Sequence, residues 1–398
     1  MQSNNSYYIE VANKQRYFEG QYICGDVFLN KRIKTQNRIL SVLSDGMGHG
    51  VKANILANLT AHMSINFAEE HKDAGTIAKI IMETLPICSE RHTSYATFTI
   101  VDILQGIATI LEYDNPTCLI MRGGNIYEPK WEQVQLENID HEGRSRIIQS
   151  CTFIPTKEDR IIYISDGVTQ SGMGSDKWPL GWQRDNYVKF VQQSILNDRY
   201  IPAGKLAQRV VDMAHTNDNY DSKDDTSCGV IYFRDAREMI IATGPPITPE
   251  EDKKYVEKVK DFNGKKIICG ATTAEIFARE MNGQIQDDYI NIDPTLPPCS
   301  HMEGVDLITE GILTLNKVES ILNIMSLTDM QLKNGPADQI VSLLMNNDRI
   351  HFLVGTKINQ DHHDANMPVE IEIRRTLINR IASLLEKKYL KEVSIEYL

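Results

Sequence analysis

Short strand-like runs and longer helical patterns of apolar residues alternate in the first half of the chain. The apolar runs at residues 21–29 and 38–45 are brief and end near Gly-Asp or Asp-Gly, which is typical of strands that enter tight turns. Beyond Gly50 the period changes and predicts a helix, because apolar residues recur every four positions. These positions are Val51, Ile55, Leu59, Met63 and Phe67.

Further strands and helices follow in an order that favours stacked antiparallel sheets. Strand-like runs joined by turn signals occupy residues 93–104, 106–115, 117–125, 158–168 and 226–233. Helical periodicity is present in residues 74–88, 186–196 and 202–216. Consecutive strands with helices in pairs do not fit an alternating βαβ arrangement. We therefore predict an α+β fold, an αββα sandwich of two antiparallel sheets flanked by helix pairs.

The second half predicts a separate unit. Residues 237–252 are rich in Pro, Gly and acidic side chains and predict a linker or a strand-exit loop. Residues 265–281 and 304–322 then each contain a strand, a tight turn and a helix. A length of 398 residues also exceeds that of one ordinary domain. We predict a first domain over residues 1–238 and a C-terminal α/β domain over residues 239–398.

Composition narrows the class of protein. A net charge of −12 argues against a non-specific nucleic-acid binder, which normally has a basic surface. The seven cysteines are scattered and form no CxxC pair, which is typical of a reducing compartment. The N-terminus lacks the pattern of a signal peptide, and no apolar run approaches the roughly 20 residues that span a bilayer. We therefore expect a cytoplasmic protein without nucleic-acid or membrane partners.

Acidic residues stand at the ends of several apolar strands. Asp26 follows "YICG", Asp45 follows "SVLS", Asp166 follows "IYIS", and Asp224 and Asp225 precede "TSCGVIYF". For any one of them a simple Asp-Gly turn is a sufficient explanation. The segment "DGMGHG", however, has more glycine than a hairpin needs. Together the acids indicate a shared chemical role.

That role is the binding of divalent cations. Mg²⁺ and Mn²⁺ prefer oxygen ligands, and carboxylates on rigid strand ends converge where two sheets meet. Two such ions about 3.5–4 Å apart can activate one water for in-line attack on phosphorus. This chemistry needs acids and no nucleophilic side chain, and the sequence has no convincing nucleophile. We therefore predict two cations, Mn²⁺ or Mg²⁺.

These motifs resemble one known family. Gly25-Asp26, "VLSDGMGHGVKAN", "NPTCLIMRGG", "DRIIYISDGVTQSG" and "DDTS" occur in the order found in metal-dependent (type 2C) protein serine/threonine phosphatases. The sequence is most similar to their stage II sporulation protein E-like bacterial branch, over about residues 20–235. The resemblance implies a β-sandwich with Mn²⁺ or Mg²⁺ between the sheets. The final motif usually reads Asp-Asp-x-Thr in relatives, and a hydroxyl is retained here.

The resemblance also implies roles for individual residues. Asp45 corresponds to the carboxylate that bridges both metals, and Gly46 to the residue whose backbone carbonyl ligates one of them. Asp166 and Asp224 correspond to the remaining ligands of the other metal. Asp26 corresponds to the acid that holds metal-bound water. Which of Asp224 and Asp225 is the ligand stays open, and Asp45, Asp166 and Asp224 are the predicted catalytic residues.

Other segments carry weaker signals. His49 could donate protons, although a plain helix start explains it better. "CGATTAEIFAREM" (residues 269–281) could cradle phosphate but lacks the known nucleotide-binding spacings, so a strand-to-helix turn is favoured. The segments "DHHD" (361–364) and "CSH" (299–301) are only weak indications of a metal site. The segment "KWPLGW" (177–182) could read a substrate or could simply pack.

We therefore predict a phosphoprotein phosphatase that uses a two-metal-activated water. The resemblance implies a phosphorylated regulatory protein of the anti-sigma-factor-antagonist type as the partner, and the sequence leaves a homodimer open. The C-terminal domain would be regulatory or partner-binding, and could act by tilting the helices of residues 51–88. The alternatives are an inactive phosphatase-fold binding module, a phosphatase of a small phosphorylated metabolite or nucleotide, and a structural scaffold.

Overall fold

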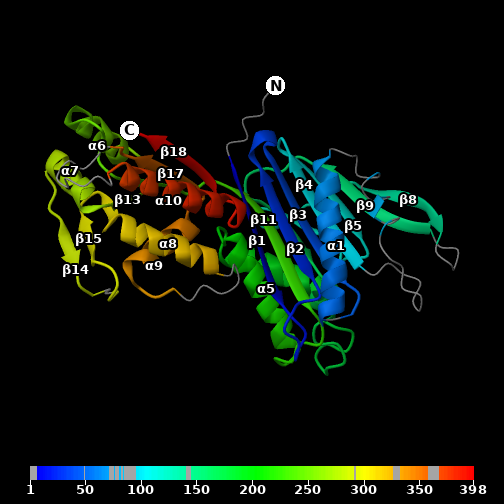
Figure 1. Cartoon of the computed structure of the whole chain (residues 1–398). Coiled ribbons are helices and arrows are strands. Elements are labelled where there is room, and N and C mark those ends of the chain that lie inside the picture. Colours follow the sequence, from blue (N-terminus) through cyan, green and yellow to red (C-terminus); the bar gives the residue numbers. More distant parts are fainter. Residues whose placement is uncertain are drawn as a thin grey trace. The chain divides into compact units, whose positions relative to one another are not determined.

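The computed structural model describes residues 7–48, 50–70, 96–139, 145–290, 293–325, 332–356 and 367–398, together with Thr76, Ile80, Ile81 and Thr84. The chain divides into two compact units, Met1–Asp235 and Ala236–Leu398 (Figure 1). This division falls three residues before the predicted boundary at residue 238. As far as the chain is described, the hydrophobic cores of each unit consist of residues of that unit.

The first unit is built on two antiparallel sheets. One has the strand order β1-β11-β10-β6-β7, formed by β1 (Tyr8–Arg16), β11 (Thr226–Arg234), β10 (Asp159–Ile164), β6 (Leu119–Arg122) and β7 (Asn125–Ile126). The other has the order β2-β3-β4-β5-β9-β8, formed by β2 (Val27–Ile33), β3 (Arg38–Gly46), β4 (Ala96–Leu104), β5 (Ile107–Tyr113), β9 (Ser145–Phe153) and β8 (Trp131–Ile139). Every pairing within these two sheets is antiparallel, as predicted.

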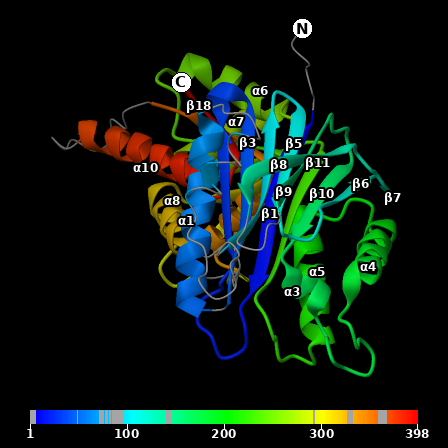
Figure 2. The same cartoon turned by 90° about the vertical axis from the view of Figure 1, so that its right-hand side faces the viewer.

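The two sheets stack face to face, and helices cover their outer faces (Figure 2). Along β3, Ile39 and Leu43 point into the core between the sheets, whereas Leu40 and Val42 face the helix α1 (Gly50–Glu69). This alternation follows from the two-residue period of a strand. On the other sheet, α4 (Gln183–Asn197) and α5 (Ala203–Asn217) pack as a pair. The predicted helix over residues 74–88 lies largely outside the described residues.

The helix α1 buries a different face from the one that its large apolar residues suggest. Ala53, Ala57 and Ala61 are fully buried against the sheet. Val51 and Ile55 are instead 63% and 61% exposed. Small side chains let the helix backbone approach the strands closely, so the row of alanines faces inward. The predicted helix is confirmed.

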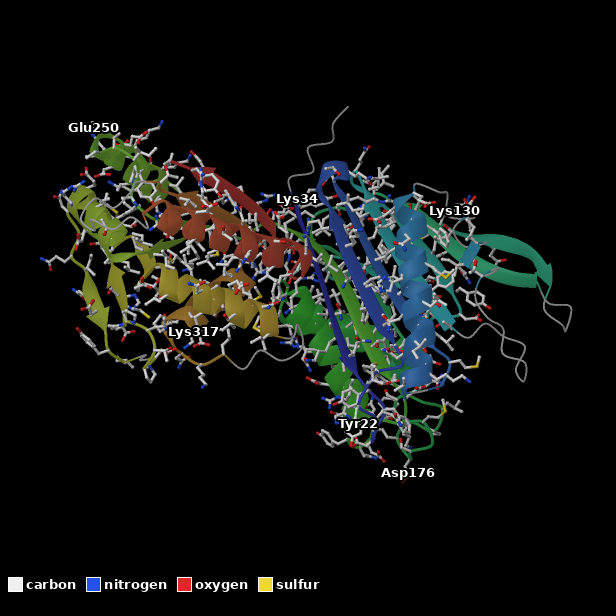
Figure 3. All side chains as sticks on the ribbon, viewed as in Figure 1. Tyr22, Lys34, Lys130, Asp176, Glu250 and Lys317 are labelled. Atoms are coloured by element: carbon white, nitrogen blue, oxygen red, sulfur yellow. The ribbon has the colours of Figure 1, made fainter. Side chains whose placement is uncertain are left out.

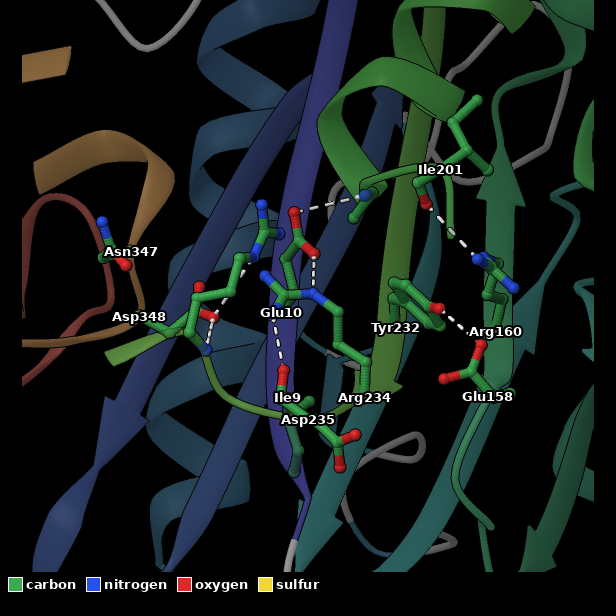
Figure 4. Close-up of polar contacts among 12 residues, drawn as sticks. Ile9, Glu10, Glu158, Arg160, Ile201, Tyr232, Arg234, Asp235, Asn347 and Asp348 are labelled. Atoms are coloured by element: carbon green, nitrogen blue, oxygen red, sulfur yellow. Dashed lines mark hydrogen bonds and ion pairs between the residues drawn. The ribbon is translucent and has the colours of Figure 1, made fainter. Parts of the chain in front are cut away.

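Polar contacts hold the end of β11 that is remote from Thr226 (Figure 4). Arg234 forms an ion pair with Glu10 on β1, with 2.6 Å between Nε and Oε2. The other oxygen of Glu10 accepts a hydrogen bond from the backbone N–H of Ala203, the first residue of α5, at 3.2 Å. Nearby, the Arg160 guanidinium lies 3.6 Å from the centroid of the Tyr232 ring. These contacts join β1, β10, β11 and α5.

A buried glutamate near the end of β5, Glu112, is expected to make the stability of this unit depend on pH. The backbone N–H of Cys118 donates to Glu112 Oε1 at 2.6 Å. Burial raises the pKa of Glu112 to about 7, against the lowering effects of its hydrogen bonds to Cys118 and of the charge of Arg184. The folded chain therefore binds a proton that the unfolded chain releases near pH 4.5. The free energy of unfolding falls as the pH rises from about 4.5 to about 7.

We expect Glu112→Gln to flatten this pH dependence. Its neutral amide cannot titrate, and its oxygen can still accept from Cys118. At pH 8 the variant should be more stable than wild type by roughly 3 kcal/mol, since each pKa unit is worth about 1.4 kcal/mol. Urea unfolding at pH 5, 6, 7 and 8 measures this by tryptophan fluorescence, because the three tryptophans lie in the first unit. Parallel pH profiles for the two proteins would contradict it.

The second unit contains a mainly parallel sheet with the order β14-β15-β16-β13-β12-β17-β18. Its strands are β12 (Glu238–Thr243), β13 (Lys265–Cys269), β14 (Gln286–Asp288), β15 (Cys299–Met302), β16 (Val305–Thr309), β17 (Arg349–Val354) and β18 (Glu392–Tyr397). Its α-helices are α6 (Asp252–Lys260), α7 (Ala271–Met281), α8 (Ile312–Ile324), α9 (Pro336–Asn346) and α10 (Met367–Lys387). Strand β12 pairs in parallel with both β13 and β17, so part of the predicted linker is a central strand. In the described part of the chain, no helix is both long and apolar enough to cross a membrane.

Candidate active site

Two of the predicted acids lie side by side at one edge of the six-stranded sheet. Asp45 is the penultimate residue of β3, and Asp26 immediately precedes β2. The antiparallel register pairs Val27 with Ser44. One step further along the ladder therefore brings Asp26 opposite Asp45, and the charge of Asp26 raises the pKa of Asp45. Both side chains are largely buried.

Two further acids stand at the neighbouring edge of the five-stranded sheet. Asp166 is the first residue of the short helix α3 (Asp166–Gln170), directly after β10. Asp224 lies just before β11, which pairs with β10. The backbone N–H of Ser165 donates to the carbonyl of Ser227 at 3.1 Å and so holds these two chain segments together. The strand ends therefore position both carboxylates.

The four carboxylates converge where the two sheets meet. Burial, and then the charges of Asp26, Asp166 and Asp224, hold the pKa of Asp45 well above its usual range. Burial raises the pKa of Asp26 to about 8, although hydrogen bonds from Ser227 and Ser165 lower it. Burial likewise raises the pKa of Asp166, which lies beside Asp45. The site therefore crowds acidic groups in a poorly solvated place, where their charged forms are disfavoured unless a cation compensates them.

Two glycines allow this close approach. An added Cβ at Gly46 would lie 2.2 Å from the carbonyl oxygen of Ala53, in the first turns of α1. An added Cβ at Gly167 would lie 2.3 Å from the carbonyl oxygen of Asp225. In both cases the obstructing atom belongs to the backbone, so it cannot swing aside. The glycine after each strand-end aspartate is thus needed for packing, beyond any role in a turn.

The adjacent aspartates Asp224 and Asp225 have different surroundings. Both oxygens of Asp225 are used by backbone N–H groups, those of Phe18 at 3.0 Å and Gly25 at 2.9 Å. Asp224 Oδ1 accepts from the N–H of Asp225 at 2.8 Å, and the charge of Asp224 raises the pKa of Asp45, whereas the charges of both aspartates act on Asp26. The geometry therefore favours Asp224 as the acid that faces the other carboxylates.

Four polar residues of this site were missed by the sequence prediction. Gln170 Nε2 donates to Asp166 Oδ2 at 2.6 Å from one turn along α3, a spacing that the sequence could have revealed. Ser227 Oγ donates to Asp26 Oδ2 at 2.6 Å. Ser165 and Gln15 contact the same group of residues. The partners of these three are distant in sequence, so no local pattern signals them.

The donor set fits hard divalent cations. Such ions take oxygen ligands, and Mg²⁺ uses only one or two carboxylates while keeping several waters. Across the described ranges, no group of three or more His, Cys, Asp or Glu side chains is arranged to hold a metal ion. The fit thus rests on the proximity of Asp45 to Asp26 and Asp166, whose charges raise the pKa of Asp45 and would be neutralised by a cation.

The remaining candidate motifs belong elsewhere. Trp182 is buried in the core beneath α4 and α5, and Trp178 Nε1 donates to Asn217 Oδ1 at 3.1 Å. The loop that carries them begins near Asp166, and Asp176 in this loop lies at the same end of the first unit as Tyr22 (Figure 3). Cys269 ends β13 and α7 follows, as the favoured strand-to-helix turn requires. His49 and residues 361–364 lie outside the described residues.

The layered fold and the acidic edge define the class of protein. They are the architecture of a PP2C-type protein serine/threonine phosphatase domain, in which paired sheets present carboxylates for divalent cations. The profile of the family "Stage II sporulation protein E (SpoIIE)" matches residues 35–234, which is 200 of the 398 residues. The chain belongs to this family. Among curated proteins, no relative matches the chain.

Solved structures include similar proteins of low sequence identity. The PP2C phosphatase domain with a regulatory fragment of SpoIIE from Bacillus subtilis is 18% identical, with a TM-score of 0.46 over 57% of this chain and 64% of that chain. RsbX in complex with magnesium is 17% identical, with a TM-score of 0.41 over 57% of this chain and 96% of that chain. A serine/threonine phosphatase of S. agalactiae is 13% identical, with a TM-score of 0.39 over 56% of this chain and 99% of that chain.

Proposed function

We propose that this protein hydrolyses phosphoserine or phosphothreonine in a protein substrate. The proximity of Asp26, Asp45, Asp166 and Asp224 at the ends of strands from two sheets, where the charges of the other three act on Asp45, carries the proposal. Mn²⁺ or Mg²⁺ ions bound there would activate a water for attack on phosphorus and neutralise the charge of the phosphate. Family membership supports the same reaction. A binding module without activity would not need to retain these buried acids.

Each residue has a proposed part in this site. Asp45 would bridge two cations, because it lies beside acids from both sheets, Asp26 and Asp166, whose charges act on it. The backbone carbonyl of Gly46 would ligate one cation, and Asp166 and Asp224 would ligate the other. Asp26 would orient water beside Asp45. Gln170 would fix the orientation of the Asp166 carboxylate, since it donates to Oδ2.

The test is hydrolysis of p-nitrophenyl phosphate and of a phosphoserine peptide, with Mn²⁺ against EDTA. Turnover of both substrates that requires Mn²⁺ supports the proposal. Turnover of phosphorylated metabolites or nucleotides, with no action on the peptide, would favour the small-molecule alternative. Absence of both turnover and Mn²⁺ binding would favour the alternative of an inactive phosphatase-fold binding module. We propose a phosphorylated regulatory protein, of the anti-sigma-factor-antagonist type, as the physiological partner.

We further propose that the unit after Asp235 is regulatory. Because the cores of the first unit contain, among the described residues, none beyond Phe233, residues 1–235 should fold when produced alone. We expect this fragment to retain Mn²⁺-dependent hydrolysis, with a rate that differs from that of the full chain. Parallel assays at equal concentration measure the difference. Identical rates and identical Mn²⁺ affinity would contradict a regulatory effect on the basal reaction.

A further inference from the structure

The strand β1 has an inward-facing row of side chains that changes character towards the candidate site. Ile9 and Val11 pack in the apolar core between the sheets. Asn13 and Gln15 continue the same two-residue period and are polar. Asn13 Oδ1 accepts from Asn30 Nδ2 on the opposite sheet at 3.1 Å. Burying a polar side chain between packed sheets costs free energy unless the side chain is hydrogen-bonded. The polar side chains at this end of β1 therefore need hydrogen-bond partners.

For Gln15 that partner is Asp26, reached together with Ser227. Gln15 and Ser227 are directly opposite each other in the β1–β11 ladder, so their side chains share a face. Gln15 Nε2 donates to Ser227 Oγ at 3.1 Å and to the backbone carbonyl of Asp26 at 3.0 Å. Ser227 Oγ then donates to Asp26 Oδ2 at 2.6 Å. One sheet thus holds both the backbone and the carboxylate of an acid that belongs to the other sheet.

Asp225 holds the segment in front of Asp26. Its carboxylate is only 3% exposed and accepts from the backbone N–H groups of Phe18 and Gly25. The approach is so close that an added Cβ at Gly25 would lie 2.6 Å from Asp225 Oδ2. The two hydrogen bonds tie both ends of the loop over residues 18–25 to the start of β11. Each is charge-assisted and hence stronger than a neutral hydrogen bond.

We propose that Gln15, Asp225 and Ser227 are positioning residues for the cation site, acting through Asp26. The inference rests on the proposed function, because it assumes that cations bind among these carboxylates. Asp26 precedes β2 and so lacks the full ladder that holds Asp45. The three residues keep its carboxylate oriented before a cation arrives, so less ordering is needed on binding. Partners that orient metal ligands typically change metal affinity 10–100-fold when removed.

The test is Mn²⁺ binding to the full chain, measured by isothermal titration calorimetry without substrate. We expect Ser227→Ala and Asp225→Asn to weaken Mn²⁺ binding by roughly 10–100-fold. Ser227→Thr keeps the hydroxyl and should restore the affinity. Gln15→Leu should weaken binding, whereas Gln192→Leu should not. Gln192 is the matched control, since it is a half-buried glutamine whose Nε2 donates to the carbonyl of Gly124 at 3.1 Å.

Urea unfolding in EDTA separates positioning from general stability. The inference holds if Ser227→Ala loses Mn²⁺ affinity while its unfolding midpoint stays close to that of Ser227→Thr. It is overturned if Ser227→Ala and Asp225→Asn bind Mn²⁺ as tightly as wild type, or no more weakly than Gln192→Leu. If Asp225→Asn fails to fold, the comparison of Ser227→Ala with Ser227→Thr still tests the inference. Wild-type chain that binds no Mn²⁺ would instead refute the proposed function, and the inference with it.

Discussion

Asp45→Asn and Asp166→Asn will each lower Mn²⁺-dependent hydrolysis of p-nitrophenyl phosphate by roughly 10²–10³-fold, comparable to the loss of a major electrostatic group in other enzymes. Asparagine keeps the shape of the side chain but removes the negative charge that a bridging ligand needs. Asp45 lies beside acids from both sheets, whose charges act on it, so its replacement affects every proposed cation contact. The assay compares initial rates in saturating Mn²⁺ and in EDTA.

A lower stability of the variant protein should not be the cause of this loss of hydrolysis. Asp45 is buried beside the charges of Asp26, Asp166 and Asp224, so a neutral amide relieves repulsion in the metal-free protein. We expect the unfolding midpoint of Asp45→Asn in EDTA to equal or exceed that of wild type. Asp176→Asn is the control, because Asp176 is an exposed acid in the loop after α3 (Figure 3). Full activity in Asp45→Asn would refute a metal-bridging role for this residue.

Gly46→Ala will impair both the fold and the site. The new methyl group would lie 2.2 Å from the Ala53 carbonyl oxygen, so α1 must move away from the end of β3. Overpacking of this kind typically costs about 1–3 kcal/mol of stability. Because Asp45 precedes Gly46 on the same strand end, Mn²⁺ binding should weaken as well. Urea unfolding by tryptophan fluorescence and calorimetric Mn²⁺ titration measure the two effects.

A second glycine provides the control for this substitution. An added Cβ at Gly204, in α5, would meet only the Cβ of Ala12 at an ordinary 3.6 Å. Gly204→Ala should therefore stabilise the protein by roughly 0.5–1 kcal/mol, as expected for alanine in a helix. It should leave Mn²⁺ affinity unchanged. Equal stability of the two variants would show that the contact between Gly46 and Ala53 is not restrictive.

Helix α1 shows that the periodicity of apolar residues predicts a helix but does not predict which face of the helix is buried. The four-residue repeat from Val51 correctly predicts a helix, because only a helix aligns residues with that spacing. It does not identify the buried face, since Ala53, Ala57 and Ala61 repeat with the same period one face away. The helix packs so close to the sheet that small side chains such as alanine occupy the buried face. That selection depends on the shape of the sheet surface, which no local pattern describes.

The strand β12 is a second element that the sequence alone did not predict. Residues 238–243 form the centre of the parallel sheet, yet Pro, Gly and acidic residues follow directly and favour a linker. A six-residue apolar segment is too short to outweigh such neighbours in a reading of the sequence alone. Its identity as a strand comes from partners on both sides, β13 and β17, which lie far along the chain.

The sequence by itself determined the class of fold, the strand-end positions of Asp26, Asp45 and Asp166, and the cation chemistry that these acids permit. Those features are local, because strand periodicity and Asp-Gly turns involve neighbouring residues. Only the tertiary structure decided that Asp225 anchors the loop before Asp26 while Asp224 faces the other acids. It also brought Gln15 and Ser227 to Asp26. Hydrogen bonds between residues some 200 positions apart, as from Ser227 to Asp26, depend on how two sheets stack, and that stacking is set by the whole core.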